Sequence, residues 1–434
     1  MPTNLHPRDA SAGYKRYVLV LLVVVYVFNF IDRTILSILL EPIKAEFGLT
    51  DTQLGFLSGL AFALFYTLMG IPIARWADRG ARRSIIAIAT FVWSGMTAMT
   101  GFATGFASLL AARVGVGIGE AGCSPPAHSL LSDYFPPERR ATALGIYSLG
   151  IPIGGGIGYL AGGWLAEWFD WRTAFIVVGA PGVVLAGVVQ LTLREPVRGA
   201  YDPAPAAPGR QESVGEVLRF MMSLASFRHM AMGAALHAFY GYGAGAFNPA
   251  FFVRSHALSV SEIGTWLAAI GFTGGVIGVY LGGYLSDRIA ERDARWYMWL
   301  PAVSTAVYVP FAFFLYLWPT PHMALAMAFP GSLLGGMYLG PTFAMTQTLV
   351  RPEMRALASA ILLFIINLIG LGFGPQGVGL LSDLLRPEFG VESLRYALLA
   401  VVVGFALWSV VHYALAARTL RDDLKAKDLV GAAA

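Results

Sequence analysis

Charged residues are scarce in this chain of 434 residues: they make up 13% of it, whereas soluble domains carry roughly 25%. Cysteine is nearly absent as well. Cys123 is the only one, which excludes an internal disulfide, an iron–sulfur cluster and a thiolate zinc site. None of the few lysines follows a glycine, so the chain has no phosphate-binding loop of the G-x-x-x-x-G-K-S/T type. These absences exclude a soluble domain, a disulfide scaffold and direct use of ATP.

Long apolar runs dominate what is present. Hydrophobic residues make up 56% of the chain, and its mean hydropathy is +0.64. Runs of about 20 residues, each long enough to span a bilayer as a helix, recur along the whole sequence. The pattern predicts an all-α membrane protein of twelve transmembrane helices. We expect these helices to start near residues 17, 52, 84, 106, 140, 172, 228, 260, 296, 322, 356 and 392.

One connection is much longer than the others and divides the chain into six spans plus six. It runs from Arg194 to Arg228 and contains several prolines, followed by a polar stretch from Gln211 that could form a surface helix. We expect an N-terminal six-helix bundle over 1–193, a cytoplasmic linker over 194–227 and a C-terminal bundle with a cytoplasmic tail over 228–434. The short remaining loops leave no room for a soluble catalytic domain, so no enzyme is expected.

Basic residues are distributed unequally between the two sides of the membrane. If the N-terminus is cytoplasmic, 23 of the 30 Lys and Arg residues fall on the cytoplasmic side and five on the other. The asymmetry predicts a multi-pass inner-membrane protein with both termini in the cytoplasm. It also explains the pI of about 9.1 without a nucleic-acid partner. The seven histidines show no paired spacing, so no metal site is expected.

The two halves repeat short basic motifs. Asp78-Arg79 matches Asp287-Arg288, and the run 137–141 matches the run 352–356, at offsets of 209 and 215 residues. Two pseudo-repeats with a basic loop at the same place in each suit a rocker-type transporter that exposes its site to alternate sides. The residues predicted to gate this motion are Asp78, Arg79, Arg83, Asp287 and Arg288.

Four charged residues lie inside predicted spans: Asp32, Arg33, Arg113 and Glu120. Charge within a membrane is a functional-site hypothesis by default. Asp32 and Arg113 lie at similar depth, roughly 10 Å from the outer ends of their helices, and Glu120 follows Arg113 by seven residues on the same helix face. An arginine close to a carboxylate favours its charged form, so a moving Arg113 could switch protons on and off. The alternative is a static ion network.

Arg33 points about 100° away from Asp32 around the helix, so its role is left open between a headgroup contact and a packing charge. The second half has no intramembrane charge but offers aromatic and polar side chains. A cavity that is ionic on one side and aromatic on the other suits an amphiphile, with a headgroup against Arg113. The predicted substrate contacts in the second half are His237, Tyr240, Tyr242, Tyr338 and Thr342.

Glycines at strict four-residue spacing mark the fifth span, at 150, 154, 158 and 162. Such a stripe lets a neighbouring helix approach closely, and packing is the interpretation that we favour. Pro152 on the same span could also soften it as a bending point.

Several motifs resemble the major facilitator superfamily. GIPIARWADRGARR (Gly70 to Arg83) is similar to its loop 2–3 signature, and GGYLSDR (Gly282 to Arg288) to the second-half copy. Within it, three strings resemble the Spinster branch. These are NFIDR from Asn29 to Arg33, RVGVGIGEAG from Arg113 to Gly122, and IYSLGIPIGGGIGYLAGG from Ile146 to Gly163.

The resemblance implies export or transfer of lysolipids, sphingosine-phosphate-like molecules or related amphiphiles. Asp32 and Glu120 would be the protonation sites and Arg113 their switch, with Asn29 and Arg33 among the substrate contacts. A proton gradient would be the energy source, with no bound cofactor, and we expect a monomer that contacts its substrate, protons and membrane lipids. The alternatives are a small organic anion symporter or drug antiporter of the same superfamily and, outside transport, a lipid-binding sensor or a membrane enzyme.

Overall fold

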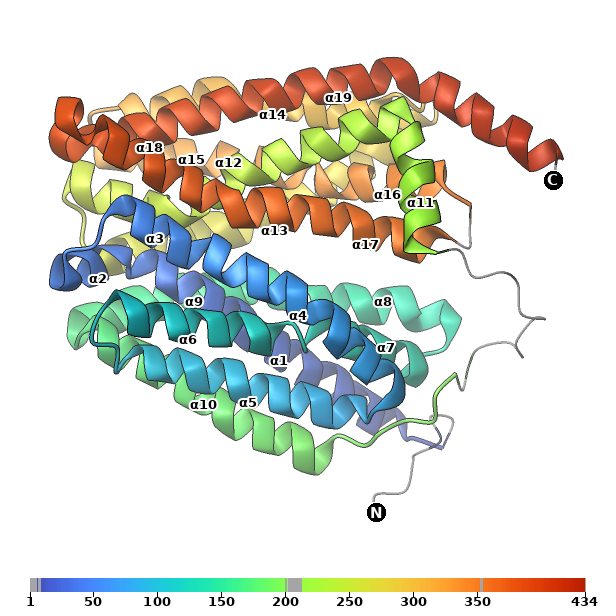
Figure 1. Cartoon of the computed structure of the whole chain (residues 1–434), viewed down its shortest axis with the longest axis horizontal. Coiled ribbons are helices and arrows are strands. Elements are labelled where there is room, and N and C mark those ends of the chain that lie inside the picture. Colours follow the sequence, from blue (N-terminus) through green and yellow to red (C-terminus); the bar gives the residue numbers. More distant parts are fainter. Residues whose placement is uncertain (1–5, 7–8, 200, 202–212, 352–353, 434) are drawn as a thin grey trace. The chain divides into compact units, whose positions relative to one another are not determined.

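The computed structural model describes residues 6, 9–199, 201, 213–351 and 354–433, and these residues are almost entirely helical (Figure 1). No β-strand occurs within these ranges. Nine segments of this part of the chain are long and apolar enough to cross a membrane, and one of them, Leu357–Lys425, contains two successive spans. The helices α5 (Arg82–Thr100) and α12 (Ala225–His256) fall outside that set.

In chain order, the described helices group into twelve spans, each of which begins within five residues of its predicted start. Broken spans account for the larger number of helices. The first six spans are α1 (Ala12–Ile38), α3 with α4 (Asp51–Ser58 and Leu60–Arg79), α5, α6 with α7 (Phe106–Glu120 and Ser124–Tyr134), α8 with α9 (Pro137–Ser148 and Gly150–Trp168) and α10 (Trp171–Thr192).

The last six spans begin with α12 and end with the C-terminal helix. A short helix, α11 (Val214–Ser223), precedes them, within the stretch for which the sequence allows a surface helix. Ser213 caps its first turn in a reciprocal box with Glu216. The spans are α12, α13 (Val260–Ala290), α14 (Trp296–Leu317), α15 with α16 (Pro321–Gly336 and Leu339–Leu349), α17, η2 and α18 (Arg355–Ile366, Asn367–Gly372 and Phe373–Phe389) and α19 (Ser393–Ala433).

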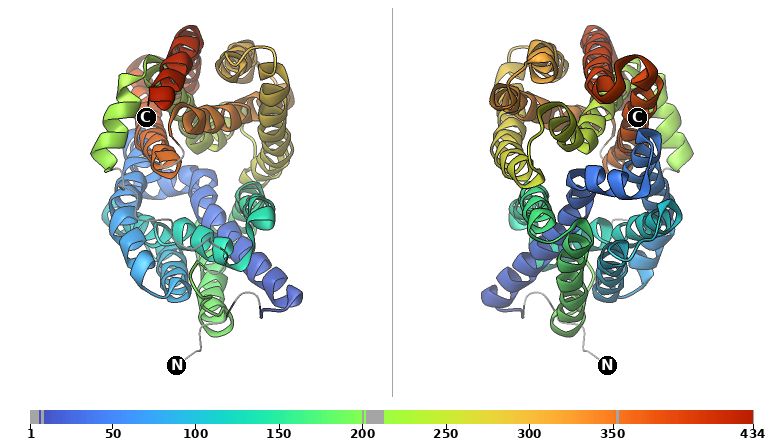
Figure 2. Two further views of the ribbon diagram at one scale, coloured as in Figure 1. Left: turned by 90° about the vertical axis from the view of Figure 1, so that its right-hand side faces the viewer. Right: turned by 90° about the vertical axis from the view of Figure 1, so that its left-hand side faces the viewer.

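The chain forms two compact units whose helices are seen roughly end-on in Figure 2. Unit 1 contains residues 1–49, 60–208 and 259–268, and unit 2 contains residues 50–59, 209–258 and 269–434. The units therefore follow the two halves of the sequence except for two short exchanged segments. The exchanged segments are the start of the second span, which belongs to unit 2, and the start of the eighth span, which belongs to unit 1.

In unit 1, the glycine stripe of α9 packs against α1. A Cβ atom added at Gly154 would lie 2.4 Å from the Val27 carbonyl oxygen, and one at Gly162 would lie 2.6 Å from the Ile38 side chain. Gly150 and Gly158 make similar approaches to the same helix. The packing interpretation of this stripe is confirmed, and it sets the position of α1.

Glycines also determine the place of α6 between two neighbours in unit 1. A Cβ atom at Gly119 would lie 2.6 Å from the Trp93 backbone nitrogen on α5, and one at Gly117 would lie 2.9 Å from the Phe62 carbonyl oxygen on α4. Larger residues would push α6 away from both helices. The glycine-rich string in the fourth span therefore brings α4 and α5 close to the polar residues of α6.

In unit 2, the short helix α3 is held against α18 by backbone contact and by polar capping. The Asp383 carboxylate accepts hydrogen bonds from the Asp51 and Thr52 backbone N–H groups, at 3.1 and 2.7 Å, at the start of α3. Arg254 donates two bonds of 2.7 Å to the Asp51 carboxylate. The glycine at 379 lets the two helices meet at the Asp51 carbonyl. A carboxylate at a helix N-terminus stabilises the helix, so these contacts fix the position of α3 in unit 2.

Candidate functional site

Five polar residues of α1 and α6 form a buried group in unit 1, called here the charged cluster: Asn29, Asp32, Arg33, Arg113 and Glu120. Asp32 and Glu120 are each 1% exposed, and Arg113 is 8% exposed. Charge at this depth in a membrane costs at least about 2.5 kcal/mol per residue on insertion scales. Such a cost is rarely tolerated without a function, so this cluster is the candidate site.

Helical periodicity brings the members of the charged cluster together on each helix. On α1, Asp32 and Arg33 follow Asn29 by three and four residues, which places the three side chains within one turn. On α6, Arg113 and Glu120 are seven residues apart, which places them on one face. The glycine contacts of α9 and α6 then bring α1, α4 and α6 into one bundle.

Arg33 and Glu120 form the ion pair of the cluster, with Arg33 Nε 2.5 Å from Glu120 Oε2. The Glu120 side chain is fully buried, and that of Arg33 is 19% exposed. The sequence left the role of Arg33 open because it diverges from Asp32 around the helix. Because the two side chains point in different directions around α1, the Arg33 guanidinium reaches Glu120 while the Asp32 side chain points another way. The ionic partner of Glu120 thus comes from the neighbouring helix.

Asp32 and Arg113 lie close together but make little use of each other's charge. The Arg113 Nη1 group donates to the Asp32 backbone carbonyl at 3.4 Å, which is a long hydrogen bond. Among the described residues, neither carboxylate oxygen of Asp32 has a hydrogen-bond partner, and Arg113 Nε has none either. The Asn29 amide and Glu120 Oε1 are likewise without one in this part of the chain. A buried site with several open donors and acceptors is equipped to take a ligand, water or a proton.

Aromatic rings surround the two arginines of the cluster. The Arg33 guanidinium carbon lies 5.0 Å from the ring centre of Phe30, 4.9 Å from that of Phe62 and 5.1 Å from that of Tyr66. The Arg113 guanidinium carbon lies 4.7 Å from the ring centre of Phe62. Sequence analysis missed Phe62 and Tyr66, although their four-residue spacing on an apolar helix was a signal of one shared face.

The predicted contacts of the second half form an uncharged and largely buried network within unit 2. The His237 ring nitrogens lie 3.1 Å from Thr305 Oγ1 and 3.1 Å from the Gly335 carbonyl oxygen. The Tyr240 hydroxyl lies 2.9 Å from His237 Nδ1. Tyr338 stacks on the His237 ring with 4.0 Å between ring centres. These residues hold one another in place across α12, α14, α15 and the start of α16.

The two remaining predicted contacts of unit 2 are Thr342 and Tyr242. Thr342 is fully buried, donates to the Tyr338 carbonyl at 2.6 Å and lies 2.9 Å from the Tyr413 hydroxyl. Tyr242 is 39% exposed, more than any other predicted contact on α12. A role in substrate binding stays a prediction for His237, Tyr240, Tyr338 and Thr342, and Tyr242 has the most accessible ring of the set.

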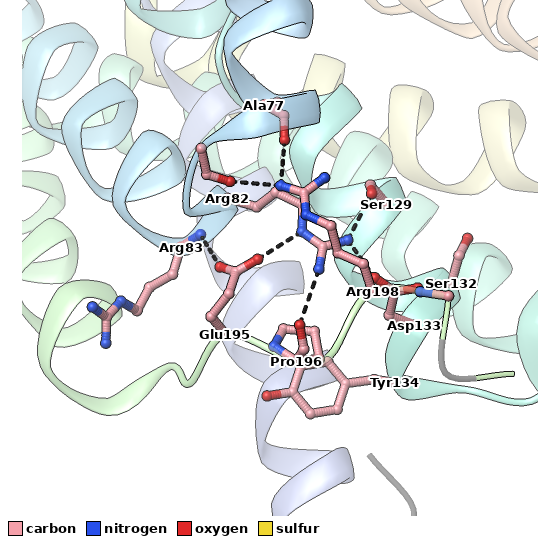
Figure 3. A network of polar contacts seen from close by, with 12 residues as sticks. Ala77, Arg82, Arg83, Ser129, Ser132, Asp133, Tyr134, Glu195, Pro196 and Arg198 are labelled. Atoms are coloured by element: carbon pink, nitrogen blue, oxygen red, sulfur yellow. Dashed lines mark hydrogen bonds and ion pairs between the residues drawn. The ribbon is translucent and has the colours of Figure 1, made fainter. Parts of the chain in front are cut away.

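A second charged group lies where α5 begins, around Arg82 (Figure 3). The Arg82 side chain is 1% exposed and donates to Glu195 at 2.8 Å, to Ser129 at 2.8 Å and to Asp133. Arg198 donates to the carbonyl oxygens of Ala77 and Gly80, at 2.7 and 2.6 Å. The segment after α10 is thereby tied to the loop between α4 and α5.

The predicted gating residues lie around this loop and its copy in the second half. Arg83 points away from the network in Figure 3, although its backbone N–H donates to Glu195 at 3.0 Å. Arg79 is exposed and lines a cavity of about 460 Å³ with Glu195 and Arg198, while the Asp78 side chain lies outside the described residues. In unit 2, Asp287 accepts from Tyr297, and Arg288 donates to Tyr284. Sequence analysis missed Arg82, whose signal was its place in the basic loop.

Comparison with known proteins gives the chain a family. The model of the Major Facilitator Superfamily matches residues 22–375. An MFS-type efflux pump of Mycolicibacterium smegmatis is 36% identical over 93% of this chain and 92% of its own length. Human protein spinster homolog 1 is 28% identical over 90% of this chain and 78% of its own length.

A solved structure matches the whole fold. It is a bacterial homolog of the human lysosomal transporter Spinster in an inward-facing, unoccupied conformation, with 37% identity and a TM-score of 0.89. The match covers 95% of this chain and 99% of that one. The resemblance of the helix 1, 4 and 5 motifs is thereby confirmed, together with the twelve-helix fold. The family and fold are those of membrane transporters, not of enzymes. The chain is a multi-pass membrane transporter that belongs to the Major Facilitator Superfamily and is of the Spinster type.

Proposed function

We propose that this transporter moves a lysolipid or sphingosine-phosphate-like amphiphile and couples that movement to protons. The observation that carries the proposal is the charged cluster, in which two buried carboxylates and two arginines stand with several polar atoms unpartnered among the described residues. A purely structural cluster would pair its buried charges, because an unpaired one costs stability. Here Asp32 remains open beside Arg113.

The proposed protonation sites are Asp32 and Glu120. Burial in a low-dielectric interior favours the protonated form of a carboxyl group, and an arginine beside it favours the charged form. Movement of Arg113 toward Asp32, or of Arg33 away from Glu120, would therefore release or take up a proton. Alternating access of the two units to the two sides of the membrane would turn this exchange into transport.

The headgroup of the substrate is proposed to bind the arginines. A guanidinium offers a planar fork that matches a phosphate with two parallel hydrogen bonds. Arg33 retains 19% exposure and so is accessible to such a group. The acyl chain would lie against aromatic side chains, among which Tyr242 has an accessible ring. Asn29, with an amide unpartnered among the described residues, is suited to a further headgroup contact.

The membrane arrangement belongs to the same proposal. Both termini and the connection from Arg194 to Arg228 would face the cytoplasm of an inner-membrane protein that acts as a monomer, with the proton gradient as energy source and no bound cofactor. Because Cys123 is the only cysteine and is buried, Cys123→Ser provides a background for labelling. A cysteine introduced into that connection should react with a membrane-impermeant maleimide only after the cells are opened. Reaction in intact cells would contradict the orientation.

The substrate is tested by flux in liposomes that contain the purified protein. We expect saturable transport of lysophospholipids, faster under an imposed pH gradient and dependent on acyl chain length, with a compact sugar acid as the control. Arg113→Ala should abolish it. Lysophospholipid flux that does not respond to the pH gradient would contradict proton coupling alone and leave the substrate assignment intact.

A second candidate is export of drug-like compounds, favoured by the similarity to the mycobacterial efflux pump over nearly the whole chain. The same liposomes decide between the two. Faster saturable transport of a cationic drug than of any lysolipid would favour drug antiport, because the carboxylates would then bind the cation. Faster transport of the sugar acid, without dependence on chain length, would favour an organic anion symporter. Binding without any flux would leave a sensor.

A further inference from the structure

Phe62 occupies a special place among the aromatic residues around the charged cluster. It lies in the first turn of α4 and is fully buried. Its ring is in contact with the guanidinium groups of both arginines, at 4.9 Å from Arg33 and 4.7 Å from Arg113. In contrast, Phe30 and Tyr66 contact only Arg33 of the two arginines within the described part of the chain. The Phe62 ring is therefore shared between the two cations of the site.

Arg113 depends on this ring more than Arg33 does. Arg33 has the ion pair with Glu120 and two further rings, whereas Arg113 has one long hydrogen bond to the Asp32 carbonyl and a partnerless Nε among the described residues. A buried guanidinium is attracted to the negative face of an aromatic ring, and the attraction is strongest where water is absent. The ring thus competes with the Asp32 carboxylate for the Arg113 charge.

The backbone around Phe62 is held so that the ring cannot easily shift. A Cβ atom at Gly117 would lie 2.9 Å from the Phe62 carbonyl oxygen and 3.5 Å from ring carbon Cδ2. Gly117 lies on α6 between Arg113 and Glu120, so the approach of the two backbones sets the level of the ring relative to both residues.

We propose that Phe62 is a positioning residue that holds Arg113 away from the Asp32 carboxylate and thereby sets the pH at which the charged cluster exchanges protons. The inference rests on the proposed proton coupling and names the group that tunes it. The protonation of the cluster also depends on the titratable and charged groups that interact within it. These groups are Tyr26, Asp32 and Arg33 on α1, Tyr66 on α4, Arg113 and Glu120 on α6, and Cys123 before α7.

The test compares Phe62→Leu with the matched variant Phe30→Leu, which removes a ring from Arg33 alone. Infrared spectra of purified protein, recorded across a pH series, report the carboxyl bands that Asp32→Asn and Glu120→Gln remove. In Phe62→Leu, Arg113 is free to approach Asp32, and an opposite charge that close shifts protonation by about one pH unit or more. We expect the pH midpoint of the Asp32 carboxyl band to move to lower pH by that amount in Phe62→Leu. In Phe30→Leu the same midpoint should move by less than half of that amount.

Two further variants keep the test decisive. Phe62→Tyr retains the ring and should keep the wild-type midpoint, while Phe62→Met keeps apolar bulk without a ring and replaces the leucine variant if that protein does not fold. An unchanged midpoint in Phe62→Leu and Phe62→Met, an equal shift in Phe30→Leu, or the absence of a titrating band assignable to Asp32 or Glu120 would overturn the inference.

The same proteins separate this inference from the proposed function. Their flux in liposomes, measured across the same pH series, should move with the infrared midpoint. Wild-type flux that does not depend on pH would contradict proton coupling, while a shift of the infrared midpoint in Phe62→Leu would still establish the positioning role. Conversely, pH-dependent wild-type flux with an unmoved midpoint in the variants would remove only the role of Phe62.

Discussion

The charged cluster of unit 1 and the network around His237 in unit 2 hold their polar groups in opposite ways. In unit 1 the interior is charged, and Asp32, Arg113 and Asn29 keep polar atoms without a hydrogen-bond partner among the described residues. In unit 2 the network around His237 is uncharged, and both nitrogens of His237 have partners, as does Thr342. The buried Asp51 carboxylate of this unit is paired with Arg254. Under the proposed function, the charged cluster of unit 1 would change its protonation, while the network of unit 2 would maintain its packing.

The energetic contrast between the units points the same way. A buried polar group left unsatisfied costs about 1–3 kcal/mol, and a charged one costs more. The network around His237 avoids that cost by linking three helices. The charged cluster incurs the cost, which selection tolerates where it supports function. Substitutions in each unit test whether proton exchange is confined to unit 1.

The largest effect is expected from Asp32→Asn. The amide cannot exchange a proton, so uptake driven by a pH gradient should fall at least about tenfold, the usual scale for losing a proton-transfer group being 10²–10⁴. Exchange of substrate at equal pH on both sides should persist. Liposome flux measures both the gradient-driven uptake and the exchange at equal pH. Asn29→Asp is a companion variant, which adds a carboxylate one helical turn from position 32. Full gradient-driven uptake by Asp32→Asn would place the coupling elsewhere.

Removing one partner of the buried ion pair should destabilise unit 1. Arg33→Met leaves the Glu120 carboxylate without its 2.5 Å partner, which costs about 3–5 kcal/mol for a buried pair. The double variant Arg33→Met with Glu120→Gln should recover most of this loss, because no uncompensated charge remains. Thermal unfolding in detergent gives the comparison. A single variant as stable as wild type would show that the pair is not desolvated.

His237→Phe should sharpen the contrast by affecting stability without affecting proton coupling. The substitution removes the hydrogen bonds to Thr305 and Tyr240, at an expected cost of about 1–3 kcal/mol in the free energy of unfolding. Transport should keep its wild-type pH profile, since the network carries no charge that unit 1 needs. A displaced pH profile would break the comparison, because it would give unit 2 a part in proton exchange.

The smallest effect is expected at an exposed carboxylate of unit 1. A hydrogen bond from Arg172, with another from Trp171, lowers the pKa of Glu46 below its ordinary value of 4.5. A lowered folded-state pKa stabilises the protein above the ordinary pKa, and the stabilisation is lost as the pH falls through the folded value. Glu46→Gln should therefore lower Tm slightly at pH 7, and the difference should vanish in acid. A difference in Tm between wild type and Glu46→Gln that grows below pH 4 would contradict the lowered pKa of Glu46.

Sequence reasoning reached the fold because membrane insertion is governed by local composition. Each span needs about 20 apolar residues, whatever its neighbours are, so the twelve starts could be read from windows of the chain. For the same reason Asp32, Arg33, Arg113 and Glu120 stood out as charges in apolar surroundings. The glycine stripe of the fifth span was also legible, since its spacing alone defines one helix face.

Tertiary structure decided which of these residues meet. Helix periodicity gives the direction of a side chain on its own helix but not the rotation or depth of the helix that it faces. The pairing of Arg33 with Glu120, the shared ring of Phe62 and the burial of Arg82 among Asp133 and Glu195 all depend on contacts between helices. The position of α3 in unit 2 also depends on tertiary structure, because the carboxylate that caps its first turn, Asp383, comes from a distant part of the chain.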